Sequence, residues 1–328
     1  SLSTIISKNK LLLIGVVCVG IGGFIPMFIN HFVVILVLRA ILGVGVGLIM
    51  PILPSVATDY FEGHQRNTVM GLIGALTCAG GIFNSLVGGI LAEIGWRYNF
   101  LVYLTTIPIF IIVMLFLPNE GIAKQYKQEK VRISPEVIYI CMVALVFTTV
   151  KFVFTLNISM FISEEQIGDA AVTGLVSSVY TAGGFIAGII FGKMAKLMKQ
   201  YILGAGMLFA AAGMLIVFLS SNMIFLFIGA FLIGTALSVV NPRFSVMISE
   251  VASPKSLALS LALCMAMYNL GQFLAPITFN ALGNLFGFTT IRPQFLMAAV
   301  ILCAMGLASL INNYIRAKIN EQVIEAEE

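Results

Sequence analysis

Long apolar runs separated by short polar stretches dominate the chain. A membrane-spanning helix needs roughly 17–25 mainly apolar residues, and ten segments meet that requirement. The predicted spans are 11–29, 33–58, 69–92, 98–117, 137–162, 171–192, 202–220, 223–248, 257–286 and 293–313. Lipid offers no hydrogen-bond partner to backbone groups, so we expect each span to be a helix. The chain is therefore predicted to be an all-α polytopic membrane protein.

The composition favours lipid as the solvent. Of 328 residues, 60% are hydrophobic and only 10% are charged, whereas soluble domains carry about 25% charged residues. The formal charge of +4 could indicate a nucleic-acid partner, but the basic residues fall between apolar runs and form no patch or stripe. We therefore expect no nucleic acid as partner.

The 18 basic residues predict an orientation through the positive-inside rule. If the N-terminus is cytoplasmic, only Arg97 and Arg292 fall in outside loops, and Arg39, Lys151 and Arg243 fall within spans. The inside loops then hold Lys8, Lys10, Arg66, Lys124, Lys127, Lys130, Arg132, Lys193, Lys196, Lys199, Lys255, Arg316 and Lys318. This asymmetry predicts an inner-membrane protein with both termini in the cytoplasm.

One long polar loop, from Pro118 to Pro135, divides four spans from six. The predicted organisation is an incomplete N-terminal helical half (1–117), a central cytoplasmic loop (118–135), a six-helix C-terminal half (136–315) and a cytoplasmic tail (316–328).

An internal repeat relates the two parts. Marked residues recur 191 positions apart, since 213 minus 22 is 191 for the pair Gly22 and Gly213. The other matches are Lys8 with Lys199, Gly15 with Gly206, Gly43 with Gly234, Pro51 with Pro242, Asp59 with Glu250, and Gly80 with Gly271. Transporters are often built from such duplicated halves. By this offset the first half would begin about 55 residues before Ser1, which is room for two spans, so we expect four plus six helices of a six-plus-six arrangement.

Two motifs resemble those of the major facilitator superfamily. Arg39-Ala40-Ile41-Leu42-Gly43-Val44-Gly45 matches the family pattern R-x-x-x-G-x-G. The segment 80–89, followed by Gly95-Trp96-Arg97, is similar to the antiporter signature G-x-x-x-G-P-x-x-G-G. Lys8 and Lys10 stand where a family loop carries its basic residues.

The resemblance implies a major facilitator fold and secondary transport by alternating access. No cofactor or metal is expected. An enzymatic activity is not expected either, because the chain has only His31 and His64, both in loops, no paired acidic residues within spans and no H-E-x-x-H motif. The chain is similar to the drug-efflux branch of bacterial members, which implies proton-coupled export of small hydrophobic or amphipathic compounds. Asn84-Ser85 replaces the Gly-Pro of the antiporter signature, although Pro276 keeps the equivalent proline in the second half. A proton-coupled symporter that imports a sugar, an organic acid or another nutrient therefore stays open.

Two basic residues within spans are candidates for coupling or substrate binding. An ionisable group inside the membrane is a functional hypothesis by default. Arg39 could face the cavity, as the family motif implies, or reach the outer interface. Lys151 has the same two alternatives.

Polar side chains in the ninth span form a second candidate group. Tyr268, Asn269 and Gln272 fall on adjoining positions of one helical face, and Asn84 lies in the repeat-equivalent span. These groups could bind solute or form bonds between helices.

Acidic residues that end equivalent spans are candidates for a cytoplasmic gate. We expect Asp59 to pair with Lys8 or Lys10, and Glu250 with Lys196 or Lys199. Such pairs contribute only about 0–1 kcal/mol when exposed, and a solvated surface is the alternative.

Small residues and prolines within spans are predicted to shape the helices. Glycines let helices approach closely, and prolines kink them. The residues concerned are Gly43, Gly45, Gly80, Gly88, Gly89, Pro51, Pro242 and Pro276.

Overall fold

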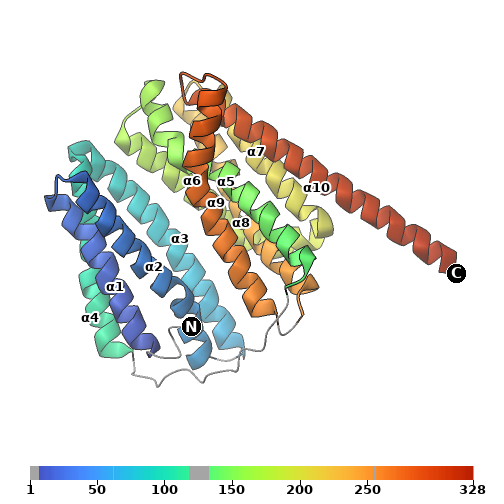
Figure 1. Ribbon diagram of the computed structural model, residues 1–328, viewed down its shortest axis with the longest axis horizontal. Helices are drawn as coiled ribbons and strands as arrows, with labels where there is room; N and C mark the ends of the chain where they lie inside the picture. The colour runs from blue at the N-terminus through green and yellow to red at the C-terminus, as the bar shows by residue number, and fades with distance from the viewer. Residues whose placement is uncertain (1–6, 62, 118–132, 254–255, 328) are drawn as a thin grey trace. The chain divides into compact units, whose positions relative to one another are not determined.

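The computed structural model describes residues 7–61, 63–117, 133–253 and 256–327; the side chains of some residues within these ranges, including Pro51, Asp59 and Lys199, lie outside the description. All regular elements in these ranges are helices (Figure 1). Ten of them are long and apolar enough to cross a membrane. The prediction of an all-α polytopic membrane protein is confirmed.

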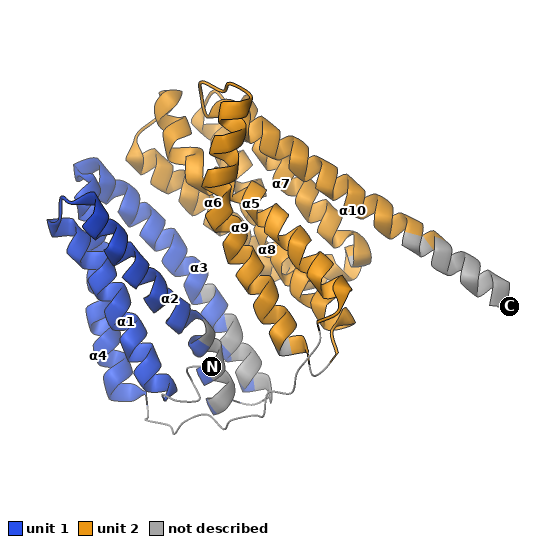
Figure 2. Ribbon diagram, in the orientation of Figure 1, with its two compact units in different colours: residues 1–129 blue, residues 130–328 orange. Residues whose placement is uncertain are grey.

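The chain forms two compact units, residues 1–129 and 130–328 (Figure 2). The division falls in the long polar loop, most of which lies outside the described residues. Unit 1 contains α1 (Lys8–Phe24), η2 (Ile25–Phe28), α2 (Phe32–Tyr60), α3 (Gly63–Ile94), η3 (Trp96–Thr105) and α4 (Thr106–Phe116). Unit 2 contains α5 (Pro135–Glu164), α6 (Ala170–Met198), η4 (Lys199–Tyr201), α7 (Ile202–Leu219), α8 (Met223–Val251), α9 (Leu257–Leu285) and α10 (Arg292–Glu327).

Local sequence signals explain several helix starts. At α5 the side chain of Ser134 accepts a hydrogen bond from the backbone N–H of Val137, Pro135 takes the first helical position, and Glu136 lies in the first turn. Asn222 caps α8 in the same way by accepting from the N–H of Phe225 at 3.2 Å. These caps satisfy backbone donors that have no partner inside the helix.

One element differs from the sequence prediction. The span expected at 98–117 begins with ten residues of 3-10 helix, Trp96–Thr105, before α4, although such helices are usually only three or four residues long. Apolar content does not distinguish the two helix types. Helix α10 continues from the predicted last span into the tail expected from residue 316 and runs to Glu327, and the cytoplasmic location of that tail stays a prediction.

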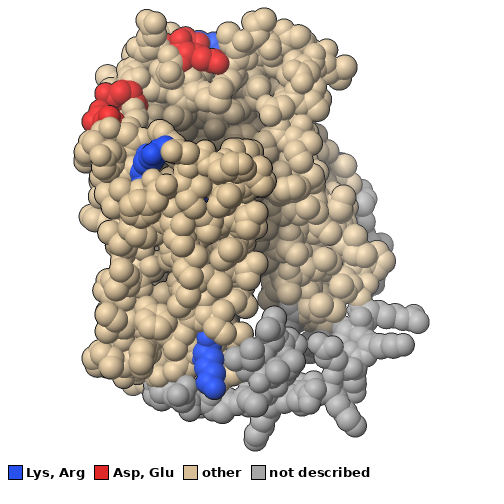
Figure 3. Space-filling model, turned by 60° about the vertical axis from the view of Figure 1, so that its left-hand side comes forward, with Lys and Arg blue, Asp and Glu red and all other residues tan. Residues whose placement is uncertain are grey.

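Unit 2 has the larger hydrophobic core. Phe147, Phe154 and Phe161 on α5 are almost fully buried, and the ring of Phe161 packs edge-to-face on that of Phe295 at 5.2 Å between centroids. Elsewhere large apolar side chains remain exposed, for example Phe116 at 77%. On the face drawn in Figure 3, the charged side chains lie in the upper part and near the bottom of the view, with a broad uncharged band between them. Exposed apolar surface of this extent fits a lipid environment.

The two units repeat each other's helix contacts. A Cβ on Gly22 would meet backbone or side-chain atoms of Leu38 and Leu42, and a Cβ on Gly213 would meet Gly229 and Ile233. Each contact in unit 2 lies 191 positions after its counterpart in unit 1, since 229 minus 38 and 233 minus 42 both equal 191. The packing of α1 on α2 is therefore repeated by α7 on α8, in agreement with the sequence repeat.

Arg292 connects three inter-helix turns at one end of unit 2. Its guanidinium donates to the carbonyl oxygens of Phe218 at 3.0 Å and Ser220 at 2.9 Å, and it pairs with Glu165. Glu164 beside it accepts a hydrogen bond from the backbone N–H of Ile291 at 3.0 Å. These bonds hold the α5–α6, α7–α8 and α9–α10 connections together.

Candidate functional site

A polar cluster inside unit 2 joins four helices. Lys151 on α5 places its Nζ atom 5.3 Å from the ring centroid of Tyr180 on α6, and it lies within electrostatic range of Tyr268 on α9. The Nδ2 atom of Asn241 on α8 donates to the Tyr268 hydroxyl at 3.1 Å. We call Lys151, Tyr180, Asn241 and Tyr268 the Lys151 cluster.

Lys151 is the buried ionisable group of this cluster. Lys151 is only 5% exposed. Within the part of the chain that the structure describes, it takes part in no ion pair. A charged side chain at this depth of a membrane span is expensive unless it is paired or faces a polar space. The face of the Tyr180 ring stabilises the ammonium through a cation–π contact. A basic group kept here can bind a proton or an anionic group of a substrate.

Glycines bring the helices of the Lys151 cluster close enough to meet. A Cβ on Gly271 of α9 would clash with the hydroxyl of Thr148 and the carbonyl of Leu145 on α5, one turn before Lys151. A Cβ on Gly234 of α8 would clash with the backbone of Tyr180 on α6. Since only glycine permits these approaches, the two positions fix the separations of α5 from α9 and of α6 from α8.

The structure does not bring all three predicted polar residues of the ninth span together. Tyr268 joins the Lys151 cluster through Asn241. Asn269 is exposed and donates to the carbonyl of Met265 in its own helix at 2.9 Å. Gln272 is half-buried on the same helix. Asn269 lies about 100° around the helix from Tyr268, whereas Gln272 lies only about 40° from it, so Asn269 is the side chain that points away from the group.

Arg39 meets aromatic side chains within unit 1. Its Nη1 atom donates to the Tyr103 hydroxyl at 3.3 Å, and its guanidinium carbon lies 4.9 Å from the ring centroid of Phe100 and 5.7 Å from that of Tyr103. Both aromatic residues belong to η3, which lies directly before α4. The other candidate of this unit, Asn84, is exposed on α3.

The structure gives Glu250 a partner that was not predicted. Both of its carboxylate oxygens face the guanidinium of Arg243, with the shorter separation at 3.1 Å. The predicted partner Lys196 is exposed on α6, and the side chain of Lys199 lies outside the described residues. Arg243 and Glu250 are seven residues apart, which is two helical turns and one face, so this spacing could have indicated the pair.

The remaining gate residues lie at the ends of α1 and α2. Lys8 is half-buried and Lys10 is exposed at the start of α1, whereas the side chain of Asp59 lies outside the described residues. The pairing of Asp59 with Lys8 or Lys10 stays a prediction.

The predicted packing glycines behave differently from one another. A Cβ on Gly45 would meet the carbonyl of Gly15 at 2.7 Å, so this glycine lies against α1. At Gly43 and Gly80 a Cβ would meet nothing within 4 Å among the described residues. Gly43 lies two residues and therefore about 200° around α2 from Gly45, so the two glycines face different sides of the helix. Close packing at Gly43 and Gly80 stays a prediction.

The other small residues and prolines lie within continuous helices. Gly88 faces the Asn99 side chain, whose Oδ1 atom would be 3.4 Å from an added Cβ, and Gly89 is buried on α3. Helices α8 and α9 continue through Pro242 and Pro276.

One buried polar pair was not predicted from the sequence. Asn157 on α5 donates through Nδ2 to the Oε1 atom of Gln294 on α10 at 2.7 Å. Both residues are buried, so the pair acts as a hydrogen-bonded link between helices. Two amides in different spans give no sign of their pairing in a single sequence.

In the described ranges, no group of three or more His, Cys, Asp or Glu side chains could hold a metal ion.

Comparison with known proteins places the chain among membrane transporters. The family model for the Major Facilitator Superfamily matches residues 1–156 and 139–325. The quinolone resistance protein NorA of Staphylococcus aureus is 22% identical over 334 residues, which cover 97% of this chain and 83% of NorA. The MFS-type transporter EfpA of Mycobacterium tuberculosis is 28% identical over 124 residues, or 38% of this chain and 23% of EfpA.

Solved structures share the fold. A bacterial homolog of the human lysosomal transporter Spinster, in an inward-facing unoccupied conformation, superposes with a TM-score of 0.66 at 16% identity and covers 93% of this chain and 80% of that chain. The inward-facing occupied conformation gives a TM-score of 0.64 at 17% identity, over 92% of this chain and 77% of that chain.

Proposed function

Because the chain belongs to the major facilitator superfamily, we propose that it is a secondary transporter that exports small hydrophobic or amphipathic compounds in exchange for protons. Similarity to a quinolone resistance protein along 97% of the chain supports export as the direction of transport and small amphipathic compounds as the substrates. The proposed mechanism is alternating access of a central site, as the family resemblance implies.

The observation that carries the proposal is the burial of Lys151 beside the Tyr180 ring and near Tyr268, whose hydroxyl accepts from Asn241. Four different helices contribute to this cluster, so a change in its charge acts on all of them. We propose that Lys151 binds a proton in one state and releases it, or pairs with an acidic group of the substrate, in the other. An ammonium without a carboxylate partner among the described residues favours substrates with a carboxylate or a polarised carbonyl group over permanent cations.

The proposed location is the bacterial inner membrane, with the N- and C-termini in the cytoplasm. The distribution of Lys and Arg between the loops supports this orientation. It places the start of α5 and the ends of α8 and α10 on the cytoplasmic side, and the Arg292 connection on the outer side.

Drug accumulation in cells tests the proposed export. We would express the chain in a bacterial strain that lacks its main efflux pumps, and measure the accumulation of norfloxacin with and without a protonophore. Lower accumulation that the protonophore abolishes is the expected result. Lys151→Met should remove the effect, whereas Lys193→Gln, an exposed change on α6, should retain it. Unchanged accumulation in cells whose membranes contain the chain would contradict export of this compound class.

Import of a nutrient by proton symport is the second candidate. The replacement of Gly-Pro by Asn84-Ser85 in the antiporter signature favours it. A counterflow assay in proteoliposomes separates the two: labelled sugar or organic acid that exchanges across the bilayer supports the symporter, and norfloxacin that exchanges supports the exporter.

A further inference from the structure

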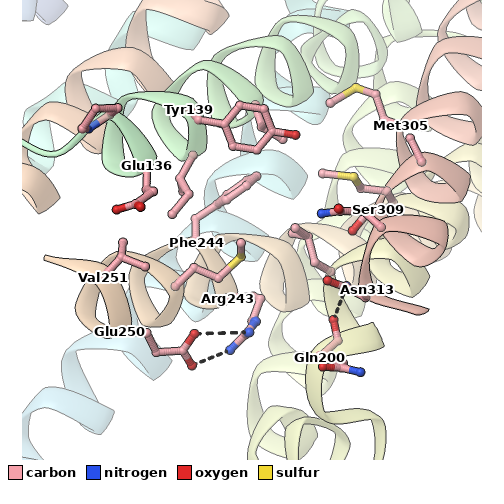
Figure 4. A pocket seen from close by; sticks show the side chains of 18 residues that line it. Glu136, Tyr139, Gln200, Arg243, Phe244, Glu250, Val251, Met305, Ser309 and Asn313 are labelled. Atoms are coloured by element: carbon pink, nitrogen blue, oxygen red, sulfur yellow. Dashed lines mark hydrogen bonds and ion pairs between the residues drawn. The ribbon is translucent and has the colours of Figure 1, made fainter. Parts of the chain in front are cut away.

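A large cavity lies at the end of unit 2 where α5 begins and where α8 and α10 pass (Figure 4). Its volume is about 770 Å³, which is within the range of about 300–1,000 Å³ seen for sites that bind drug-sized ligands. None of the four residues of the Lys151 cluster lines it. The two are neighbours along α8, because the lining residue Phe244 lies about one turn after Asn241 of the Lys151 cluster.

The polar wall of the cavity contains a donor without a partner. The Nη atoms of Arg243 face Glu250, but its Nε atom is buried and has no hydrogen-bond partner among the described residues. Buried donors are nearly always satisfied in folded proteins. The Nε and Nη2 edge of a guanidinium matches the two oxygens of a carboxylate or a phosphate, so an occupant with such a group would supply the missing acceptor.

A carboxylate lies on the opposite side of the same cavity. Glu136, in the first turn of α5, is exposed, and no ion pair with it is recorded in the described ranges. Glu250 is already neutralised by Arg243. Among the described lining residues, Glu136 is therefore the group that would favour a cationic centre on the occupant.

The rest of the wall suits an apolar body. Tyr139 and Phe244 contribute aromatic rings, and Met207, Met247 and Met305 contribute thioethers. Methionine side chains are flexible and polarisable, so such a surface adapts to chains and rings of different shape.

We propose that this cavity binds a zwitterionic amphiphile, with its anionic group on the Nε edge of Arg243, its ammonium group at Glu136 and its apolar part against the methionine-rich wall. The proposal stands on unit 2 alone and does not depend on the direction or coupling of transport. Two sources carry this chemistry: a membrane lipid with an ethanolamine headgroup, and a free amino-carboxylate amphiphile.

Direct binding to the purified full chain in detergent tests the proposal. The probes are dihexanoyl phosphatidylethanolamine for the lipid source, N-dodecyl-β-alanine for the solute source, and dihexanoyl phosphatidylglycerol as an anion without an amine. We expect saturable binding of at least one zwitterion, about tenfold tighter than that of phosphatidylglycerol, because its ammonium adds one charge-assisted hydrogen bond to Glu136.

Two conservative variants identify the groups involved. Arg243→Lys keeps a positive charge beside Glu250 but cannot form the bidentate hydrogen bonds of a guanidinium. It should weaken zwitterion binding about tenfold. Glu136→Gln should abolish the preference for the zwitterion over phosphatidylglycerol. Arg97→Lys, in unit 1, is the matched control and should bind as the unmodified chain does. Unfolding temperatures of all variants show whether each one is folded.

Each outcome bears on the proposal. Binding of the lipid alone, of the amino-carboxylate alone or of both supports a zwitterion site and identifies its source. Binding of neither probe overturns the proposal, and so does equal affinity in Arg243→Lys, Glu136→Gln and the unmodified chain.

Discussion

Arg292 and Glu165 form a salt bridge of 2.7 Å between the start of α10 and the end of α5. Both side chains are less than one-third exposed, and the same guanidinium also binds two backbone carbonyls of the α7–α8 connection. One side chain therefore satisfies acceptors on two other connections, which makes its loss more costly than the loss of an isolated surface pair.

Replacing Arg292 should destabilise unit 2. Arg292→Gln removes the salt bridge and leaves the carbonyls of Phe218 and Ser220 without their donor, so we expect a loss of roughly 2–3 kcal/mol. Thermal unfolding of the purified chain measures it. Arg97→Gln is the control, because Arg97 lies 5.3 Å from the Trp96 ring centroid and forms no ion pair within the described ranges. Equal unfolding temperatures for the two variants would contradict this role of Arg292.

The stability of the same connection should depend on pH. The hydrogen bond from Arg292, opposed by partial burial and assisted by the guanidinium charge, lowers the pKa of Glu165 below its ordinary value of 4.5. A carboxyl group with a lowered folded-state pKa stabilises the fold above its unfolded-state pKa, and this contribution is lost as the pH falls through the folded-state value. We expect the unfolding temperature to fall more steeply below pH 4.5 in the unmodified chain than in Glu165→Gln. Parallel pH profiles would show that Glu165 does not carry the effect.

Two glycines on one helix should respond in opposite ways to a methyl group. Gly45→Ala places a Cβ against the carbonyl of Gly15 and the side chains of α1, and overpacking of this kind costs about 1–3 kcal/mol. Gly43→Ala meets nothing within 4 Å and should leave the stability unchanged or slightly higher. Unfolding temperatures of the two variants provide the comparison. A larger loss for Gly43→Ala would mean that this position packs against something outside the contacts described.

Transport should require the guanidinium group of Arg39 and not only its positive charge. Arg39→Lys cannot reproduce a planar guanidinium beside Phe100 and Tyr103, and we expect roughly tenfold slower proton-coupled transport. Tyr103→Phe removes the 3.3 Å hydrogen bond but keeps the ring, so it should cost about 1 kcal/mol of stability and retain transport. Full transport in Arg39→Lys would exclude the proposed role in coupling.

Sequence patterns predicted the helices well and the side-chain partners poorly. Span length and apolar content are properties of single segments, and the repeat offset carries over whole helix pairs such as α1 with α2. The partner of Asn157 depends on how two helices are rotated against each other, which the nearly uniform hydrophobicity of a membrane helix does not show. The pair of Arg243 and Glu250 lies within one helix, and its seven-residue spacing could have indicated it. Lys151 was found as an ionisable residue in a span, but Tyr180 was not connected with it because the two lie on different helices.

The shared packing of α1 on α2 and of α7 on α8 has a consequence for how the protein assembles during synthesis. Only Ser220, Ser221 and Asn222 separate α7 from α8, so the contacts of Gly213 with Gly229 and Ile233 join positions close in sequence. Contacts of low sequence separation require little loop-closure entropy and form quickly. Each hairpin can therefore pair as soon as its second helix enters the bilayer, whereas the contact of α5 with α9 at Gly271 must wait until more than a hundred further residues have been made.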